Sequence, residues 1–191
     1  MPEDTQASNE ALRQFYLSKD EAFLSDIENE AYALQFKADL CRVATQTEGV
    51  IALNIRSHGG ITRGGLEIAD FISHNLGRIV DATVDGVCDS AATFVLLACR
   101  KRISLPNASF ILHSTTVPYN IKLDDDYEEN AAHIAAANMR TYEKVLTFYS
   151  QKLKIPKGRV KQMLKRGDQD FNDELSAEEA KEVGLITHIA K

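Results

Sequence analysis

The sequence has few of the residues that build a cross-linked or metal-bound scaffold. It contains three cysteines, Cys41, Cys88 and Cys99, and no pair of them has C-x-x-C spacing. An odd number of cysteines without that spacing argues against a disulfide framework and against a zinc site. It favours reduced thiols in a cytosol. We therefore expect a cytoplasmic protein without a metal or an organic cofactor.

Long apolar runs and clusters of basic residues are also missing. No apolar run approaches the roughly 20 residues of a membrane span, and the first residues, Met1-Pro2-Glu3-Asp4, are acidic where a signal peptide would be basic and then apolar. The 22 basic and 28 acidic residues give a net charge of −6 without a basic block. This balance argues against a nucleic-acid partner, and we expect no association with a membrane.

The length of 191 residues fits one ordinary domain. Residues 1–12 are polar and lack periodicity, so we expect a mobile N-terminal segment followed by a single domain over residues 13–191. Residues 13–17, Arg-Gln-Phe-Tyr-Leu, are interpreted as a short first strand.

Strand-like apolar runs alternate with amphipathic segments along the rest of the chain. The pattern predicts strands over 50–55, 79–87, 103–105, 109–112 and 185–189, and helices over 25–47, 65–74 and 91–99. Strands that alternate with helices of this length imply right-handed βαβ units. The predicted fold class is therefore α/β with a mostly parallel sheet.

A much longer helix is predicted from Asp124 to about Leu153, where Pro156 then breaks the pattern. At 1.5 Å per residue it would be roughly 45 Å long, which exceeds what a compact domain of this size needs. We interpret it as a projecting handle helix whose apolar stripe meets another subunit. Near the C-terminus, Ser176 and Glu179 have the spacing of a capping box.

The segment with the clearest chemical meaning is Gly86-Val87-Cys88-Asp89-Ser90-Ala91-Ala92-Thr93, between a β-branched run and an apolar helical run. A strand-to-helix turn can hold Ser90 exposed beside free backbone N–H groups that bind an oxyanion. The upstream Gly59-Gly60 can supply a second backbone donor, and His113, at the end of an apolar run, can supply a base. This order of parts suggests a serine hydrolase.

The other histidines are weaker candidates for the base. His74 and His133 fall on predicted helices and His188 lies near the C-terminus, positions more typical of surface polar residues. His58 directly precedes the diglycine and is placed to touch a substrate. On spacing alone, Ser90 and His113 can also be two unrelated polar residues at loop ends.

Four segments in order carry a resemblance to a known family. They are Arg56-Ser57-His58-Gly59-Gly60, the run Gly86-x-x-x-Ser90, Leu105-Pro106-Asn107 followed by His113, and the tail Leu175-Ser176-Ala177-Glu178-Glu179-Ala180-Lys181-Glu182-Val183-Gly184-Leu185-Ile186. Together they resemble the caseinolytic protease (ClpP) family over roughly residues 13–189. The resemblance implies the α/β fold of the ClpP/crotonase type.

The resemblance also implies roles for single residues. Ser90 would be the nucleophile and His113 the general base. The backbone N–H groups of Gly60 and Ala91 would form the oxyanion hole, with Gly59 completing the diglycine beside it. The family's aspartate lies four residues before the serine of the tail motif, a position that is Asn172 here, with Asp170 as the main substitute.

The function implied is that of a serine endopeptidase subunit. It would hydrolyse peptide bonds of unfolded polypeptides inside a compartment formed by heptameric or tetradecameric rings. A Clp-type AAA+ ATPase would feed in the substrate, and the chemistry would need no cofactor.

This chain departs from the family pattern at several of these positions. Arg56 and His58 stand where the family has Asn and Pro, and Ser114 follows His113 where the family has Gln. Such differences indicate a divergent member. They leave open a catalytically degenerate subunit that assembles with or regulates an active paralogue. A more remote alternative is a crotonase-like acyl-CoA enzyme, which shares the fold and a backbone oxyanion hole.

Overall fold

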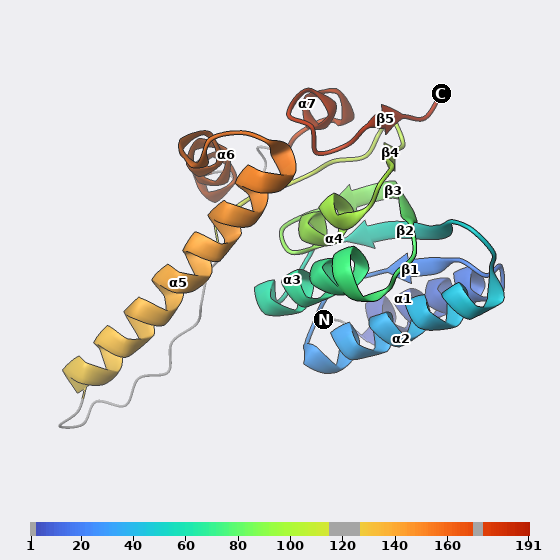
Figure 1. Ribbon diagram of the computed structural model, residues 1–191, viewed down its shortest axis with the longest axis horizontal. Coiled ribbons are helices and arrows are strands. Elements are labelled where there is room, and N and C mark those ends of the chain that lie inside the picture. Colours follow the sequence, from blue (N-terminus) through green and yellow to red (C-terminus); the bar gives the residue numbers. More distant parts are fainter. Residues whose placement is uncertain (1–2, 115–126, 170–173) are drawn as a thin grey trace. The chain divides into compact units, whose positions relative to one another are not determined.

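The computed structural model describes residues 3–114, 127–169 and 174–191 (Figure 1). The chain divides into two compact units. Residues 1–112 and 172–191 form the first, which we call the sheet unit, and residues 113–171 form the second, the helical unit.

The sheet unit is built on a five-stranded sheet in which every neighbouring pair is parallel (Figure 1). Its strands are β1 (Ala22–Leu24), β2 (Ile51–Ser57), β3 (Val80–Cys88), β4 (Arg102–Ser104) and β5 (His188–Ile189), in the spatial order β1-β2-β3-β4-β5. The predicted parallel α/β architecture is confirmed. Because crossovers between parallel strands are almost always right-handed, strands laid down in sequence order place their connecting helices on one face of the sheet.

Those connections are α2 (Glu30–Gln46), α3 (Thr62–Asp70) with the π-helical turn η1 (Phe71–Asn75), and α4 (Ala92–Ala98). They form one layer, in which α2 contacts α3 and α3 contacts α4. Alternate residues of β2 are fully buried, Ile51, Leu53 and Ile55 among them, whereas Ala52 and Arg56 are exposed. The helix layer and the buried face of the sheet therefore make the core that supports the strand ends.

The C-terminal segment is fixed to this sheet by a short helix and by an arginine. Helix α7 (Ala177–Glu182) starts with the predicted capping box: Ser176 Oγ accepts the Glu179 N–H, and the Glu179 carboxylate accepts the Ser176 N–H at 2.9 Å. On β4, the Arg102 guanidinium donates to the carbonyl oxygens of Leu185 and Gly184 at 2.9 and 3.1 Å. These bonds hold the chain end beside β4.

The N-terminal strand prediction is wrong. Residues 13–17 belong to helix α1 (Glu3–Leu17), and the first strand is β1. Tertiary contacts explain the difference: the Arg13 guanidinium donates to both carboxylate oxygens of Asp39 on α2, at 2.6 and 2.8 Å, and the Tyr16 ring stacks on Phe23 of β1. Whether residues 1–12 are mobile stays a prediction, and so does the single domain over residues 13–191.

The strand predicted over 109–112 is also only partly formed. Ser109 makes an isolated parallel bridge to Val87, and Phe110 makes an antiparallel bridge to Leu175. The segment therefore runs beside the end of β3 without joining the five-stranded sheet.

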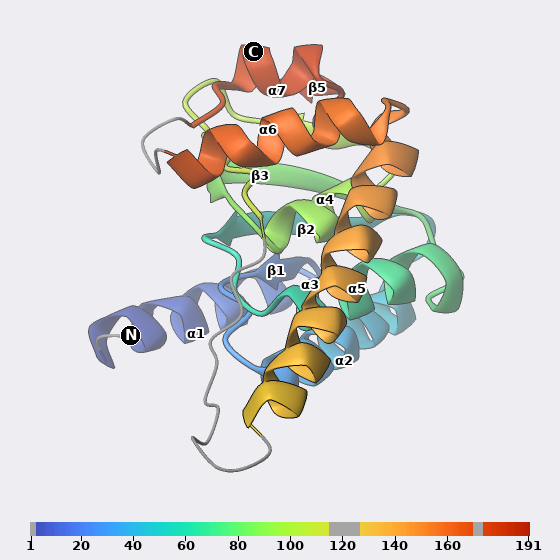
Figure 2. The same cartoon turned by 90° about the vertical axis from the view of Figure 1, so that its left-hand side faces the viewer.

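The helical unit contains α5 (Tyr127–Leu153) and α6 (Lys157–Gln169), which contact each other (Figure 2). Between them the backbone turns at Lys154, which has a φ of +57°, and Pro156 then precedes α6. The ammonium of Lys157 pairs with the Glu143 carboxylate at 3.0 Å and links the two helices. The predicted start of the long helix at Asp124 lies outside the described residues, and the helix's role as a projecting handle stays a prediction.

Candidate active site

Ser90 lies in the turn between β3 and α4, in a backbone conformation that is rare for a residue with a side chain. Its φ is +50°, in the left-handed region that costs a non-glycine residue of order 1–3 kcal/mol. The Ser90 N–H donates to Ile111 O at 2.7 Å, and the Thr93 hydroxyl donates to Ser90 O at 2.6 Å. The surrounding structure therefore holds the serine in a sharp turn at the carboxyl end of a buried strand, as a nucleophile elbow does.

The diglycine after β2 packs directly on this turn. A Cβ on Gly59 would lie 2.7 Å from the Ser90 Cβ and 2.6 Å from the Asp89 carbonyl oxygen, and Gly59 has a φ of +95°. At Gly60 the φ is +129°, and a Cβ would overlap the carbonyl group of Ile27. Neither position has room for a side chain, because Gly59 packs on the serine turn and Gly60 packs on the backbone of Ile27.

In the described part of the chain, the hydrogen bonds around the diglycine and the serine turn leave two backbone N–H groups unused. Among the described residues, neither the Gly60 N–H nor the Ala91 N–H has a hydrogen-bond acceptor. Their neighbours are fixed, because the Ile61 N–H donates to Ile27 O at 2.9 Å and the Ala92 N–H donates to Asp89 O at 3.0 Å. Rigidly held donors of this kind stabilise a developing oxyanion without reorganising.

Sequence reasoning missed the role of Asp89, which appeared only as a letter of the serine motif. Its buried carboxylate accepts the Ile111 N–H at 2.8 Å, and its own N–H donates to Ser57 O at 2.9 Å. The second carboxylate oxygen lies 3.3 Å from Nδ1 of the exposed His58. Asp89 thus ties the serine turn to β2's end and to the segment that leads to His113. Burial raises the pKa of this carboxyl group, while the His58 contact opposes the shift.

Two substitutions of Asp89 separate its acceptor from its charge. Asp89→Ala leaves the buried Ile111 N–H without an acceptor, and we expect a loss of about 1–3 kcal/mol in the free energy of unfolding. Asp89→Asn keeps an acceptor oxygen, so its stability should stay close to that of the wild type. Urea denaturation at pH 7 measures both values, and equal losses in the two variants would contradict the role of the acceptor.

Comparison of the wild type with Asp89→Asn also predicts how the free energy of unfolding depends on pH. Because the pKa of Asp89 is raised in the folded state, the folded chain binds that proton more tightly than the unfolded chain does. The contribution of Asp89 to stability therefore falls as the pH rises from the unfolded to the folded pKa. Asp89→Asn should lack this decline, which denaturation at several pH values measures.

His113 is the first residue of the helical unit, and its ring is oriented by the residue after it. Nδ1 of His113 lies 2.7 Å from Ser114 O. Because a carbonyl oxygen only accepts, the nitrogen facing it carries the hydrogen, and Nε2 keeps the lone pair that a general base needs. Ser114 is itself held by Asp168 at the end of α6: its N–H donates to Oδ1 at 2.8 Å and its hydroxyl donates to Oδ2 at 2.6 Å. Asp168 was not a sequence candidate.

The predicted site residues are thus distributed as follows. Gly59, Gly60, Ser90 and Ala91 lie together in the sheet unit, around the ends of β2 and β3. His113 belongs to the helical unit. Both candidates for the third catalytic position, Asn172 and Asp170, lie outside the described residues.

Comparisons with known proteins identify the family and the fold of this chain. The family model for Clp protease matches residues 5–191. This chain belongs to the Clp protease family. A solved structure of similar fold is that of an Asn-to-Asp mutant of ClpP1 from Listeria monocytogenes, with a TM-score of 0.74 and 23% sequence identity. The alignment covers 94% of this chain and 96% of that chain. The predicted ClpP-type fold is confirmed.

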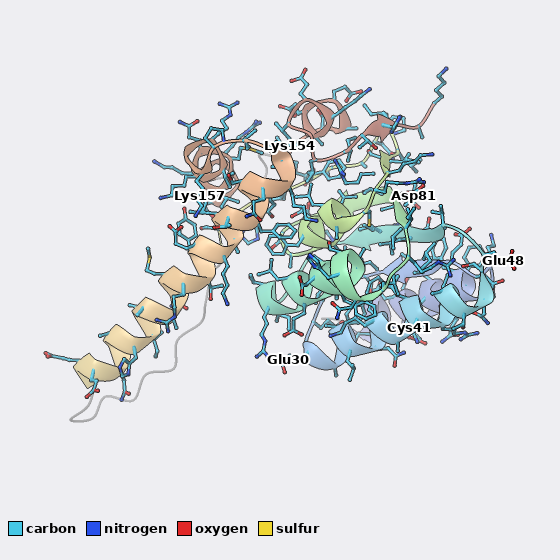
Figure 3. All side chains as sticks on the ribbon, viewed as in Figure 1. Glu30, Cys41, Glu48, Asp81, Lys154 and Lys157 are labelled. Atoms are coloured by element: carbon cyan, nitrogen blue, oxygen red, sulfur yellow. The ribbon has the colours of Figure 1, made fainter. Side chains whose placement is uncertain are left out.

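The cysteines of this Clp-family chain have no role in the chemistry proposed for the serine turn. All three are free thiols. Cys88, two residues before Ser90, is fully buried, and burial raises the pKa of its thiol well above the usual value. It therefore packs as a small hydrophobic residue. Cys41 is exposed on α2 (Figure 3).

The described residues of this Clp-family chain include neither a membrane-spanning helix nor a metal-binding cluster. None of its described helices is both long and apolar enough to cross a membrane. No group of three or more His, Cys, Asp or Glu side chains within the described ranges is arranged to hold a metal ion.

Proposed function

We propose that this member of the Clp protease family is a serine endopeptidase subunit that hydrolyses peptide bonds in unfolded polypeptides. The observation that carries the proposal is the strained Ser90 turn packed on Gly59, with two free backbone N–H groups at Gly60 and Ala91. A turn with only a structural role gains nothing from a serine at positive φ beside unpaired donors, whereas a nucleophile elbow with its oxyanion hole uses both.

In this proposal Ser90 Oγ attacks the scissile carbonyl carbon while Nε2 of His113 takes its proton. The N–H groups of Gly60 and Ala91 stabilise the oxyanion of the tetrahedral intermediate. His113 then gives the proton to the leaving amine. In deacylation, His113 takes a proton from the attacking water and returns it to Ser90 Oγ when the acyl-enzyme bond breaks. Ile111, whose backbone is bonded to Ser90 and to Asp89, precedes His113 by two residues, so the chain leads from the serine turn to the base.

Nδ1–H of His113 already faces Ser114 O, so in the proposal Asn172 or Asp170 acts as a second acceptor for that hydrogen and helps to fix the imidazole. An asparagine orients an imidazole by hydrogen bonding, as in Cys-His-Asn proteases, but it cannot stabilise the imidazolium by charge. With Asn172 in this position we expect a slower enzyme, or one whose activity depends on assembly.

The proposal includes assembly and a partner, both supported by membership of the Clp protease family. We propose that the chain forms heptameric or tetradecameric rings through α5 and receives unfolded protein from a Clp-type AAA+ ATPase. The free thiols fit a reducing cytoplasm. Bond cleavage itself needs neither ATP nor a cofactor.

Hydrolysis of a short fluorogenic peptide and of an unfolded protein tests the proposal. The assembled state is measured in parallel by analytical ultracentrifugation, with and without a Clp-type ATPase. We expect turnover of the peptide by the ring alone and faster turnover of the unfolded protein with the ATPase. A correctly assembled ring that cleaves neither substrate would indicate the degenerate subunit, and saturable binding of an acyl-CoA would indicate the crotonase-like enzyme.

A further inference from the structure

Asp168 makes an unusual pair of contacts for an exposed carboxylate. Both of its oxygens accept hydrogen bonds from one residue, Ser114: the backbone N–H donates to Oδ1 at 2.8 Å and the hydroxyl donates to Oδ2 at 2.6 Å. Hydrogen bonds to an ionised acceptor are shorter and roughly twice as strong as neutral ones. This two-point contact fixes the position and the direction of the Ser114 backbone, which one bond would leave free to rotate.

The Ser114 backbone is also the hydrogen-bond partner of the His113 ring. Nδ1 of His113 lies 2.7 Å from Ser114 O. The carbonyl that faces the imidazole therefore belongs to the residue that Asp168 clamps. His113, Ser114 and Asp168 all belong to the helical unit, so these contacts lie within one compact unit.

An acidic residue at position 168 does not stabilise α6. Asp168 lies in the last turn of α6 (Lys157–Gln169), where the helix dipole favours a basic residue and disfavours a negative charge by a few tenths of a kcal/mol or more. The negative charge of Asp168 lowers the stability of α6 slightly. The stabilising contacts of this carboxylate are its two hydrogen bonds with Ser114.

We propose that Asp168 is a positioning residue for His113, acting through Ser114. It holds the carbonyl that faces Nδ1 and thereby favours the tautomer with the hydrogen on Nδ1 and the lone pair on Nε2. The inference rests on the proposed function, in which His113 is the general base. In this chain the third catalytic position is expected to be Asn172, which carries no charge. The inference gives a carboxylate, that of Asp168, a role in positioning the general base.

Substitutions at Asp168 test this role against a matched control. Asp168→Ala removes both acceptors, and we expect kcat for a fluorogenic peptide to fall about 10- to 100-fold with KM unchanged, because small misplacements of a catalytic group have effects of that size. Asp168→Asn keeps one acceptor and should give an intermediate kcat. Asp70→Ala removes another exposed carboxylate, whose contact is with His74 in η1, and should leave kcat and KM unchanged.

Ser114 supplies the second arm of the test. Ser114→Ala removes one of the two bonds to Asp168, and Ser114→Thr retains the hydroxyl and should restore kcat. If Asp168 acts through Ser114, the double variant Asp168→Ala/Ser114→Ala should be no slower than Asp168→Ala alone. Additive losses would overturn the route through Ser114.

A spectroscopic readout keeps failure of the inference distinct from failure of the proposed function. The ¹⁵N shifts of the His113 ring report which nitrogen carries the hydrogen, whether or not the chain cleaves peptides. We expect the Nδ1–H form in the wild type and a mixture of tautomers in Asp168→Ala. An unchanged tautomer in Asp168→Ala overturns the inference even if the enzyme is active. A wild-type chain without peptidase activity overturns the proposed function, while a tautomer shift would still support the clamp on His113.

Discussion

Ser90→Ala is expected to lower the rate of peptide hydrolysis by at least about 10⁴-fold, since loss of the nucleophile removes the covalent route. The variant keeps the backbone bonds of the turn, so KM and ring assembly should stay near the wild-type values. Steady-state kinetics on a fluorogenic peptide measure the effect. Ser18→Ala is a matched control, because Ser18 is exposed and its hydroxyl donates to the nearby Phe15 O; it should keep full activity. Residual activity of Ser90→Ala within tenfold of the wild type would remove Ser90 from the mechanism.

A glycine at the same position shows whether the turn is strained, as its φ of +50° indicates. Glycine adopts this conformation without the clash that an L-residue has. Ser90→Gly should therefore be as inactive as Ser90→Ala but more stable than it by about 1 kcal/mol, as measured by chemical denaturation. Equal stability of the two variants would mean that the serine turn is relaxed in solution.

Gly59→Ala is expected to have the second largest effect, on both stability and activity. The added Cβ would lie 2.6–2.9 Å from Asp89 O, Ser90 Cβ and Ala91 N, which real Cβ atoms do not tolerate. Relief of that overlap must move the serine turn or the diglycine. Overpacking of this kind costs about 1–3 kcal/mol, and a shift of about 1 Å between nucleophile and oxyanion hole costs roughly 10²-fold in rate. Thermal denaturation and kcat/KM measure the two effects.

Gly49→Ala is the control that separates steric overlap from backbone strain. Gly49 has a φ of +85°, close to that of Gly59, but a Cβ there meets nothing within 4 Å. It should cost about 1 kcal/mol of stability with no change in kcat/KM. If Gly59→Ala is no worse than Gly49→Ala in either measurement, the close packing of the diglycine on Ser90 is not a requirement of the site.

The parallel α/β class and the serine turn could be predicted from the sequence because local patterns specify them. The β-branched run before Ser90 and the apolar run after it mark a strand and a helix, and the turn between them places the serine at the sheet's carboxyl edge. The capping box at Ser176 is equally local, since its two partners are three residues apart.

The errors occur where distant contacts decide the structure. Residues 13–17 contain β-prone aromatics, yet the ion pair of Arg13 with Asp39 and the packing of Tyr16 on Phe23 hold them in a helix. Neither contact has a signal in a single sequence, because each depends on how α1 meets elements that follow it. Strand β1 was missed for a related reason: its three residues are too short for a period-2 pattern.

The supporting carboxylates were missed because their partners are backbone groups. Asp89 holds the Ile111 N–H, and Asp168 holds the Ser114 N–H across 54 positions of the chain. A backbone N–H is present at almost every residue, so no spacing of side chains marks the one that will be bound. Only Ser90, the diglycine and His113 have residue types that indicate the chemistry proposed for them.

The central claim is that Ser90 is an activated nucleophile, and a fluorophosphonate probe tests it most directly. The purified, assembled chain is incubated with the probe, and the modified peptide is identified by mass spectrometry, with Ser90→Ala as the control. We predict modification of Ser90 in the wild type and none in the variant. An assembled wild-type chain that remains unmodified at Ser90, with or without a Clp-type ATPase, would contradict the claim.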